Sequence, residues 1–388
     1  MLTLSKTPHK TTDQTLKRSA SVAEHYGFLP IEAIMPDHGK KTRSKIPQHT
    51  EYTSHFDNEL ASVIRSYIEH GHTRLTEPTL FYQSSVNSKN PNKALFGLHV
   101  LGSSHSIAEA LLIKTALATL DDLGVTGHRV HVNSIGDRDS ATRFTKELTE
   151  YLRKNINEMP ALPRQAMKKD VFHAYDQLLK KQHPLCASAP STVEFLTESS
   201  RSHLREILEY LETAGVDYEL DPSIIGHHDC YSKTLFEIRG ELKNPEDELT
   251  VLARGGRYDE LAKKAFRQQI PAAGIIFEFE KKGRVPVSIA PAQKRKPKFY
   301  FIQLGFEARI RSLVVIEMLR KAKVPVYQSL GKEQLSDQLE LAHELAIPYC
   351  IIMGHKEALD GTVIVRNIDS RAQETIPIME LPQYLKTL

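Results

Sequence analysis

The segment from residue 253 to residue 261 brings together the residue types best suited to hold a polar ligand. It reads Ala-Arg-Gly-Gly-Arg-Tyr-Asp-Glu-Leu and directly follows a strand-like run at 249–252. Two adjacent glycines let a backbone turn tightly and approach a ligand closely, while the flanking arginine, tyrosine and aspartate side chains supply charge and hydrogen bonds. The alternative interpretation is a polar hairpin turn with solvated arginines, because Gly-Gly is also an ordinary turn signal.

Other clusters of reactive side chains are weaker candidates. The run from His227 to Cys230 has the composition of a metal site, but neighbours in a strand point to opposite faces. The run from Gly102 to His105 pairs serines with a histidine, yet it has no recognisable nucleophile turn and no third partner. The sequence also lacks a glycine-rich phosphate loop of the Walker or Rossmann type. We therefore predict neither a metal site nor a serine nucleophile.

Composition limits the classes of partner and the cellular locations that the sequence favours. The chain has 388 residues, of which 51 are basic and 48 acidic, so its net charge of +3 does not indicate a nucleic-acid binder unless a local patch exists. The three cysteines, Cys186, Cys230 and Cys350, are far apart and odd in number, which favours a reducing, cytoplasmic location. The first eighteen residues lack the apolar core of a signal peptide, and no apolar run approaches the length of a membrane span.

The larger part of the chain, residues 20–284, mixes two hydrophobic periodicities. Helical patterns occur at 60–69, 107–123, 138–152 and 200–214, and strand patterns occur at 129–133, 234–238 and 249–252. Residues 154–190 are polar, contain several prolines, and are expected to be irregular or locally helical. With the last two strands paired antiparallel, this combination predicts an α+β domain built on an antiparallel sheet.

A connector and a second domain are predicted after this part. Residues 283–298 hold three prolines and a basic cluster, which indicates an exposed linker, although such a cluster could also touch a phosphate backbone. Strand-like runs at 299–304, 324–327, 349–353 and 362–365 then alternate with helical patterns at 306–322, 334–346 and 380–385. This alternation favours a small α/β domain with a partly parallel sheet.

Several of these segments resemble, in matching order, the histidyl-tRNA synthetase family of class II aminoacyl-tRNA synthetases. The segment 253–261 resembles the second histidine-binding motif, 221–237 the region of the first, and 132–136 an Asn-Ser-Gly strand end. Residues 331–338, 347–348 and 361–366 resemble the anticodon-binding domain. The resemblance implies a class II synthetase-like antiparallel-sheet core over 1–284, a Pro/Lys-rich linker over 285–298, and an anticodon-binding-like α/β domain over 299–388.

The resemblance also implies which residues form the site. A remnant of the histidine pocket is predicted at Asp229, Tyr231, Gly255, Gly256, Arg257 and Tyr258. The residues that depart from the family at its functional positions are Asn58, Asn87, Lys89, Val100, Ser104, Gly226 and Lys281. Asn87 stands for the arginine that grips the α-phosphate and Lys281 for another arginine, and lysine lacks the planar fork of a guanidinium. No arginine at all occurs between Arg74 and Arg129.

These departures predict a cytoplasmic, dimeric paralogue that is impaired in adenylation and has no assigned catalytic residue. Its expected role is to bind tRNA or tRNA-like RNA, or to regulate a protein partner, away from membranes. No cofactor is assigned. The alternative is an active histidine–tRNA ligase with ATP and magnesium, in which Lys89, Lys93 or Lys281 would act as point charges. A further alternative is a regulatory subunit of the ATP phosphoribosyltransferase type, although that relative usually lacks the second domain.

Overall fold

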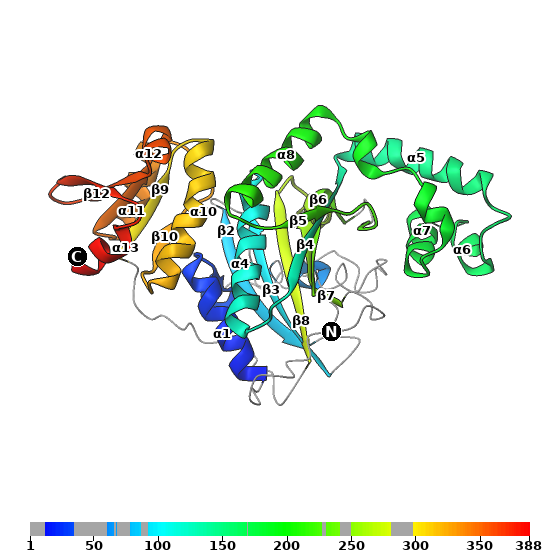
Figure 1. Ribbon diagram of the computed structural model, residues 1–388, viewed down its shortest axis with the longest axis horizontal. Coiled ribbons are helices and arrows are strands. Elements are labelled where there is room, and N and C mark those ends of the chain that lie inside the picture. Colours follow the sequence, from blue (N-terminus) through cyan, green and yellow to red (C-terminus); the bar gives the residue numbers. More distant parts are fainter. Residues whose placement is uncertain are drawn as a thin grey trace.

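The computed structural model of the protein describes residues 12–34, 60–65, 67, 78–86, 92–168, 170–226, 230–240, 250–280 and 298–388. Most of the predicted linker, residues 285–297, therefore lies outside the described residues. Figure 1 shows two sheets, one in the larger N-terminal part and one at the C-terminal end of the chain.

The larger sheet has eight strands in the order β1-β2-β3-β8-β7-β6-β4-β5. From one edge to the other they are Leu29–Pro30, Thr79–Val86, Lys93–Leu101, Ala272–Glu280, Thr250–Arg257, Ser232–Gly240, His128–Gly136 and Tyr218–Leu220. All neighbours from β2 to β4 are antiparallel, and only the two edge strands pair in parallel. The predicted antiparallel pairing of 234–238 with 249–252 and the predicted α+β class are confirmed.

One face of this sheet is covered by helices α1 (Thr12–His25), α4 (Ile107–Leu123) and α8 (Glu198–Thr213) (Figure 1). Helix α4 is apolar nearly all round because it packs on the sheet beneath and against helices beside it, so it has no broad solvated face. It ends at Gly124, whose left-handed φ of +80° closes the last turn through its N–H. The predicted buried helix at 107–123 is confirmed with the same bounds.

The opposite face carries a second apolar cluster. It is formed by the helical residues 60–65, by α9 (Asp259–Phe266) and by the side chains that point outward from the central strands, including Leu95 and Ile276. Short helix α2 (Ile31–Ile34) lies at the β1 edge. Residues at even and odd positions along one strand therefore belong to different clusters, as the pleat of a strand requires.

A helical arm projects from the end of β4 (Figure 1). It consists of α5 (Arg138–Lys154), α6 (Ala161–Ala166), α7 (Val171–Lys180), η1 (Pro184–Ser188) and η2 (Thr192–Phe195). The Asp137 side chain caps α5 by accepting a hydrogen bond from the Ser140 N–H at 2.9 Å. The arm has its own core around Phe144, Leu148 and Phe172, so it is a packed unit.

The C-terminal part contains β9 (Phe299–Gln303), α10 (Phe306–Lys321), β10 (Val326–Gln328), α11 (Leu335–Glu344), β11 (Tyr349–Met353), α12 (His355–Asp360), β12 (Thr362–Asn367), β13 (Gln373–Pro377) and α13 (Leu381–Thr387). Its sheet has the order β10-β9-β11-β12-β13, with the first three strands parallel and the last two antiparallel. The predicted partly parallel sheet is confirmed, whereas α12 and β13 were not predicted.

Helix α10 packs this small sheet against the larger part of the chain (Figure 1). The Tyr26 hydroxyl at the end of α1 donates to Glu317 of α10, and the Gln328 amide donates to the Tyr26 carbonyl at 3.2 Å. Phe306 packs edge-to-face on Tyr210 of α8, with ring centroids 5.3 Å apart. Apolar burial and hydrogen bonds both join the two parts within the described residues.

Candidate functional site

The double glycine of the 253–261 segment lies inside a central strand and forms no hairpin turn. Gly255 and Gly256 belong to β7, which is paired with β6 on one side and β8 on the other. A Cβ at Gly255 would lie 2.3 Å from the Gly274 carbonyl oxygen, and one at Gly256 would lie 2.6 Å from the Thr234 carbonyl oxygen. These glycines are therefore needed for close contact between backbones, and the expectation of a tight turn was wrong.

Arg257 follows the glycines and is completely buried. Its guanidinium makes a bidentate ion pair with Glu109 of α4, with Nε–Oε1 and Nη2–Oε2 distances of 2.8 and 2.6 Å. It also donates to the carbonyl oxygens of Ser103 and His105. Arg257 thus ties the end of β7 to the start of α4, and all of its nitrogens have partners inside the protein.

Glu109 joins this arginine to a histidine. Its Oε1 is 2.7 Å from Nε2 of His203 on α8, and the carboxylate has no exposed surface. Burial alone would raise the pKa of Glu109, but the charges of Arg257 and His203 outweigh it and lower the pKa to about 2. The carboxylate is therefore ionised at neutral pH and holds three elements together. This network draws on residues 94 and 148 positions apart, which periodicity cannot reveal.

Tyr258 faces the other side of the sheet and meets a second buried histidine. Its hydroxyl lies 3.0 Å from Nδ1 of His99 on β3, and both side chains are fully buried. The His99 ring also stacks on Phe81 of β2, with centroids 5.1 Å apart. Burial lowers the pKa of His99 to about 3, so the imidazole is neutral at physiological pH.

The predicted site residues separate into groups. Tyr231 is buried at the base of β6, and Gly226 packs against the side chains of Leu235 and Tyr231. Val100 lies in the core under α4, on the face opposite to Tyr258 and His99, and Ser104 lies exposed in the loop before α4. Val100 therefore cannot line the surface that Tyr258 faces. Four predicted positions and one pocket residue, namely Asn58, Asn87, Lys89, Lys281 and Asp229, lie outside the described residues.

Sequence reasoning missed His99, because both faces of its strand are buried and the apolar run shows no alternation. The pleat of Lys93–Leu101 puts Leu95, Gly97 and His99 on one face and Leu98 and Val100 on the other. An error of one residue in the register moves every side chain to the wrong face. The position of β3 that contacts Tyr258 is therefore residue 99, one residue before the position predicted from the family resemblance.

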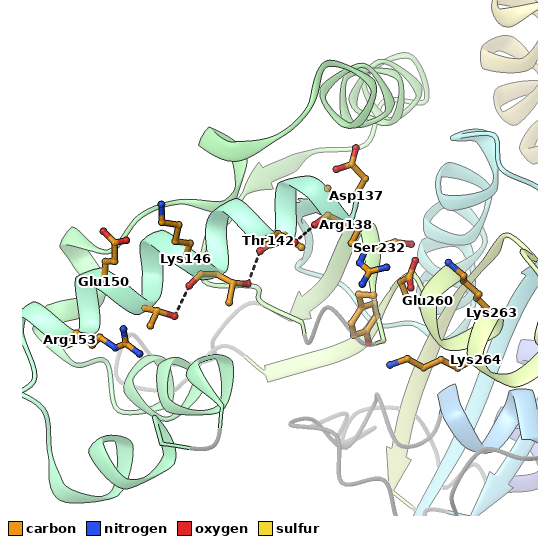
Figure 2. A pocket seen from close by; sticks show the side chains of 15 residues that line it. Asp137, Arg138, Thr142, Lys146, Glu150, Arg153, Ser232, Glu260, Lys263 and Lys264 are labelled. Atoms are coloured by element: carbon orange, nitrogen blue, oxygen red, sulfur yellow. Dashed lines mark hydrogen bonds between the residues drawn. The ribbon is translucent and has the colours of Figure 1, made fainter.

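A groove of about 830 Å³ opens beside this network, between α5 and α9 (Figure 2). Tyr231 and Ser232 lie at its base, and three threonines of α5 line its wall, each donating its hydroxyl to the carbonyl oxygen four residues earlier. The charged side chains that line it are Arg138, Lys146, Arg153, Lys263 and Lys264, together with Asp137, Glu150 and Glu260. Five cations against three anions give the groove an excess of positive charge.

Four of the five cations of the groove are available to a ligand. All five basic side chains are exposed, and Arg138, Lys146, Arg153 and Lys263 form no salt bridge with any described residue. Figure 2 shows them on two separate elements, so a polyanion lying between α5 and α9 could contact both. The part of the chain that the structure describes contains no cluster of side chains able to hold a metal ion. Its helices include none that is long and apolar enough to cross a membrane.

An antiparallel sheet covered by helices and followed by a small α/β domain with a partly parallel sheet is the architecture of a class II aminoacyl-tRNA synthetase. A family model described as "Histidyl-tRNA synthetase" matches residues 61–281, and one described as "Anticodon binding domain" matches residues 287–388. Because the first match covers more than half of the chain, the protein belongs to the histidyl-tRNA synthetase family.

The chain is also similar to individual proteins. The chain is 26% identical over 329 residues to a histidine–tRNA ligase of Thermosynechococcus vestitus, covering 83% of this chain and 76% of that protein. It is 27% identical over 337 residues to a histidine–tRNA ligase of Caldicellulosiruptor bescii, covering 84% and 79%. A crystal structure of apo histidyl-tRNA synthetase from S. aureus aligns with a TM-score of 0.44 and 20% identity, covering 84% of this chain and 81% of that one.

Proposed function

We propose that this chain is a histidyl-tRNA synthetase paralogue that is impaired in histidine adenylation and binds tRNA or tRNA-like RNA. The observation that carries the proposal is the groove between α5 and α9, in which the exposed Arg138, Lys146, Arg153 and Lys263 lie on two elements and form no salt bridge with any described residue. Phosphate backbones are bound by cations of this kind, and the contact requires no overall basic charge. The eleven basic and eleven acidic residues of 297–388 point away from a purely C-terminal electrostatic footprint.

Two observations on guanidinium groups support impaired adenylation: arginines are absent from a long stretch of the chain, and Arg257 is held by contacts inside the protein. Adenylation develops charge on phosphate oxygens, which arginine forks or metal ions must stabilise. The sequence has no arginine between Arg74 and Arg129, and Arg257 is fully occupied by Glu109 and backbone carbonyls. In this proposal Tyr231, Gly255, Gly256, Arg257 and Tyr258 support the sheet around a former pocket.

The organisation of the chain is part of the proposal. The core would span 1–284, the linker 285–298 and the anticodon-binding-like domain 299–388, in a dimer located in the cytoplasm. Regulation of a protein partner by the same dimer is the alternative to RNA binding. Sedimentation of the purified chain tests the dimer: a single species of twice the 43.9 kDa chain mass is expected, and a monomer at micromolar concentration would contradict it.

RNA binding is tested by titrating labelled tRNA with the whole protein across a range of salt concentrations. Four phosphate contacts, made by Arg138, Lys146, Arg153 and Lys263, would give a slope of log affinity against log salt of about −2.8 to −3.6. The double variant Lys146→Gln/Lys263→Gln removes one cation from each wall, so it should reduce the slope by about 1.4 to 1.8.

A matched control removes two exposed lysines outside the groove. Lys17 of α1 and Lys321 of α10 are 61% and 71% exposed, and Lys17→Gln/Lys321→Gln carries the same change of charge. The control variant should retain the slope of the unmodified protein. An affinity that is independent of salt, or an equal loss in both double variants, would contradict a role for the groove.

A further inference from the structure

On the face of the sheet opposite to α4, four adjacent strands contribute a row of paired residues that includes a histidine and two glycines. In this row Phe81 of β2 pairs with His99 of β3, His99 with Gly274 of β8, and Gly274 with Gly256 of β7. Gly274 and Gly256 lie on neighbouring strands and carry no side chains, so the ring of His99 lies over Gly274 and the ring of Tyr231 lies over Gly256.

The space around the imidazole is defined by the absence of side chains. A Cβ at Gly274 would lie 2.5 Å from Nδ1 of His99, and a Cβ at Gly97 would lie 2.6 Å from Nε2. No real Cβ atom approaches a ring nitrogen so closely, so both positions must be glycine while the ring is present. Phe81 provides a stacking partner and the Tyr258 hydroxyl a hydrogen bond. Together these four residues form what we call the imidazole niche: Phe81, Gly97, Tyr258 and Gly274.

One ring nitrogen indicates that the niche is not a conventional core site. Nε2 of His99 is fully buried and has no hydrogen-bond partner among the described residues. A polar atom buried without a partner costs stability, and an apolar ring would fill the same space without that cost. The niche therefore recognises an imidazole through the hydrogen bond between Nδ1 and Tyr258, whereas no described residue offers a hydrogen bond to Nε2.

We propose that His99 is an internal occupant of this niche and keeps free histidine out of it. Tyr258 belongs to the segment that resembles the family's second histidine-binding motif, and its hydroxyl contacts an imidazole supplied by the chain itself. The inference deepens the proposed function and rests on it for the location of the pocket, because an occupied niche would by itself prevent histidine activation. In this proposal the niche still favours an imidazole ring, but the His99 side chain already fills the space that a free histidine would need.

The test removes the His99 side chain and measures the binding of small ring compounds to the space that it leaves. In the full-length variant His99→Ala, imidazole should raise the melting temperature in a saturable way and bind at least about tenfold more tightly than thiophene, a five-membered ring without nitrogen, since one hydrogen bond to Tyr258 distinguishes them. Adding Tyr258→Phe should abolish that preference. The unmodified protein should not respond to either ring.

The control variant is Leu98→Ala, which removes a fully buried side chain from the same strand on the opposite face. It should show no preference for imidazole. An imidazole response equal in the unmodified protein and in His99→Ala, or none in His99→Ala, would overturn the proposal. If His99→Ala does not fold, calorimetric titration of the unmodified protein with L-histidine decides: saturable heat at millimolar histidine contradicts an occupied niche, and its absence supports it.

These outcomes are separate from those of the proposed function. If imidazole did not stabilise His99→Ala, only the proposal about the niche would be contradicted, because RNA binding through the groove does not depend on the niche. Conversely, a protein that does not bind tRNA would remove the proposed function and would leave a positive imidazole response in His99→Ala unaffected.

Discussion

Replacing Glu109 by glutamine should destabilise the protein more than any single surface change. Glu109→Gln keeps the shape of the side chain but removes the bidentate counter-charge of Arg257, whose fully buried guanidinium then keeps only the longer contact with Asp259 at 3.4 Å. Removing one partner of a buried ion pair typically costs about 3–5 kcal/mol. Burial alone would raise the pKa of Glu109, but the charges of Arg257 and His203 lower it to about 2, which agrees in direction with a stabilising role for the ionised carboxylate.

The assay is equilibrium unfolding in urea, comparing single and double variants. We expect Glu109→Gln to lose about 3–4 kcal/mol. Glu109→Gln/Arg257→Met should be more stable than Glu109→Gln alone, because it removes a buried guanidinium that would be held only by the longer contact with Asp259. The exposed pair of Lys17 and Asp13 provides the control, and Asp13→Asn should change stability by less than about 0.5 kcal/mol. A loss below about 1 kcal/mol in Glu109→Gln, or no recovery in the double variant, would refute the reasoning.

Three further predictions follow from the same contacts. The pKa values of His99 and Glu109 are lowered in the folded protein, to about 3 and about 2, so the free energy of unfolding should be highest above about pH 6.5 and should fall as the pH decreases towards 3. Melting temperatures between pH 7 and pH 3 measure this decline. His99→Phe should flatten it between pH 6.5 and 4.5. Gly255→Ala places a Cβ 2.3 Å from a backbone oxygen and should cost at least about 1–3 kcal/mol in urea unfolding, and a neutral result would contradict the close strand packing. Tyr26→Phe removes the hydroxyl that donates to Glu317 and should lower the calorimetric stability by about 1–2 kcal/mol, whereas an unchanged transition would show that this contact contributes nothing.

Much of the fold could be predicted because several elements have a clear periodicity. The helix at 107–123 and the strand at 349–353 have the predicted bounds, and the helix at 138–152 extends only to Lys154. Each is long or strongly apolar and ends at a residue that favours a boundary. The central strands β3 and β8 were not predicted, because both faces are buried and their apolar runs lack alternation.

The site was harder to predict because its chemistry depends on distant contacts. The sequence identifies Arg257 as a candidate ligand residue, yet its partner Glu109 lies 148 residues away and turns it into a structural residue. The resemblance placed a functional position at Val100, but the pleat of β3 puts that side chain under α4 and puts His99 beside Tyr258. The groove could not be predicted either, since its cations come from helices separated by more than a hundred residues.

Histidine-dependent exchange of pyrophosphate into ATP by the full-length protein tests the central claim most directly. The proposal has Asn87 and Lys281 in place of phosphate-contacting arginines. It therefore predicts exchange at least about 10³-fold below that of an active histidine–tRNA ligase measured in parallel, because loss of even one transition-state donor costs about 10²–10³. Exchange that requires histidine and approaches the rate of the active ligase would contradict it.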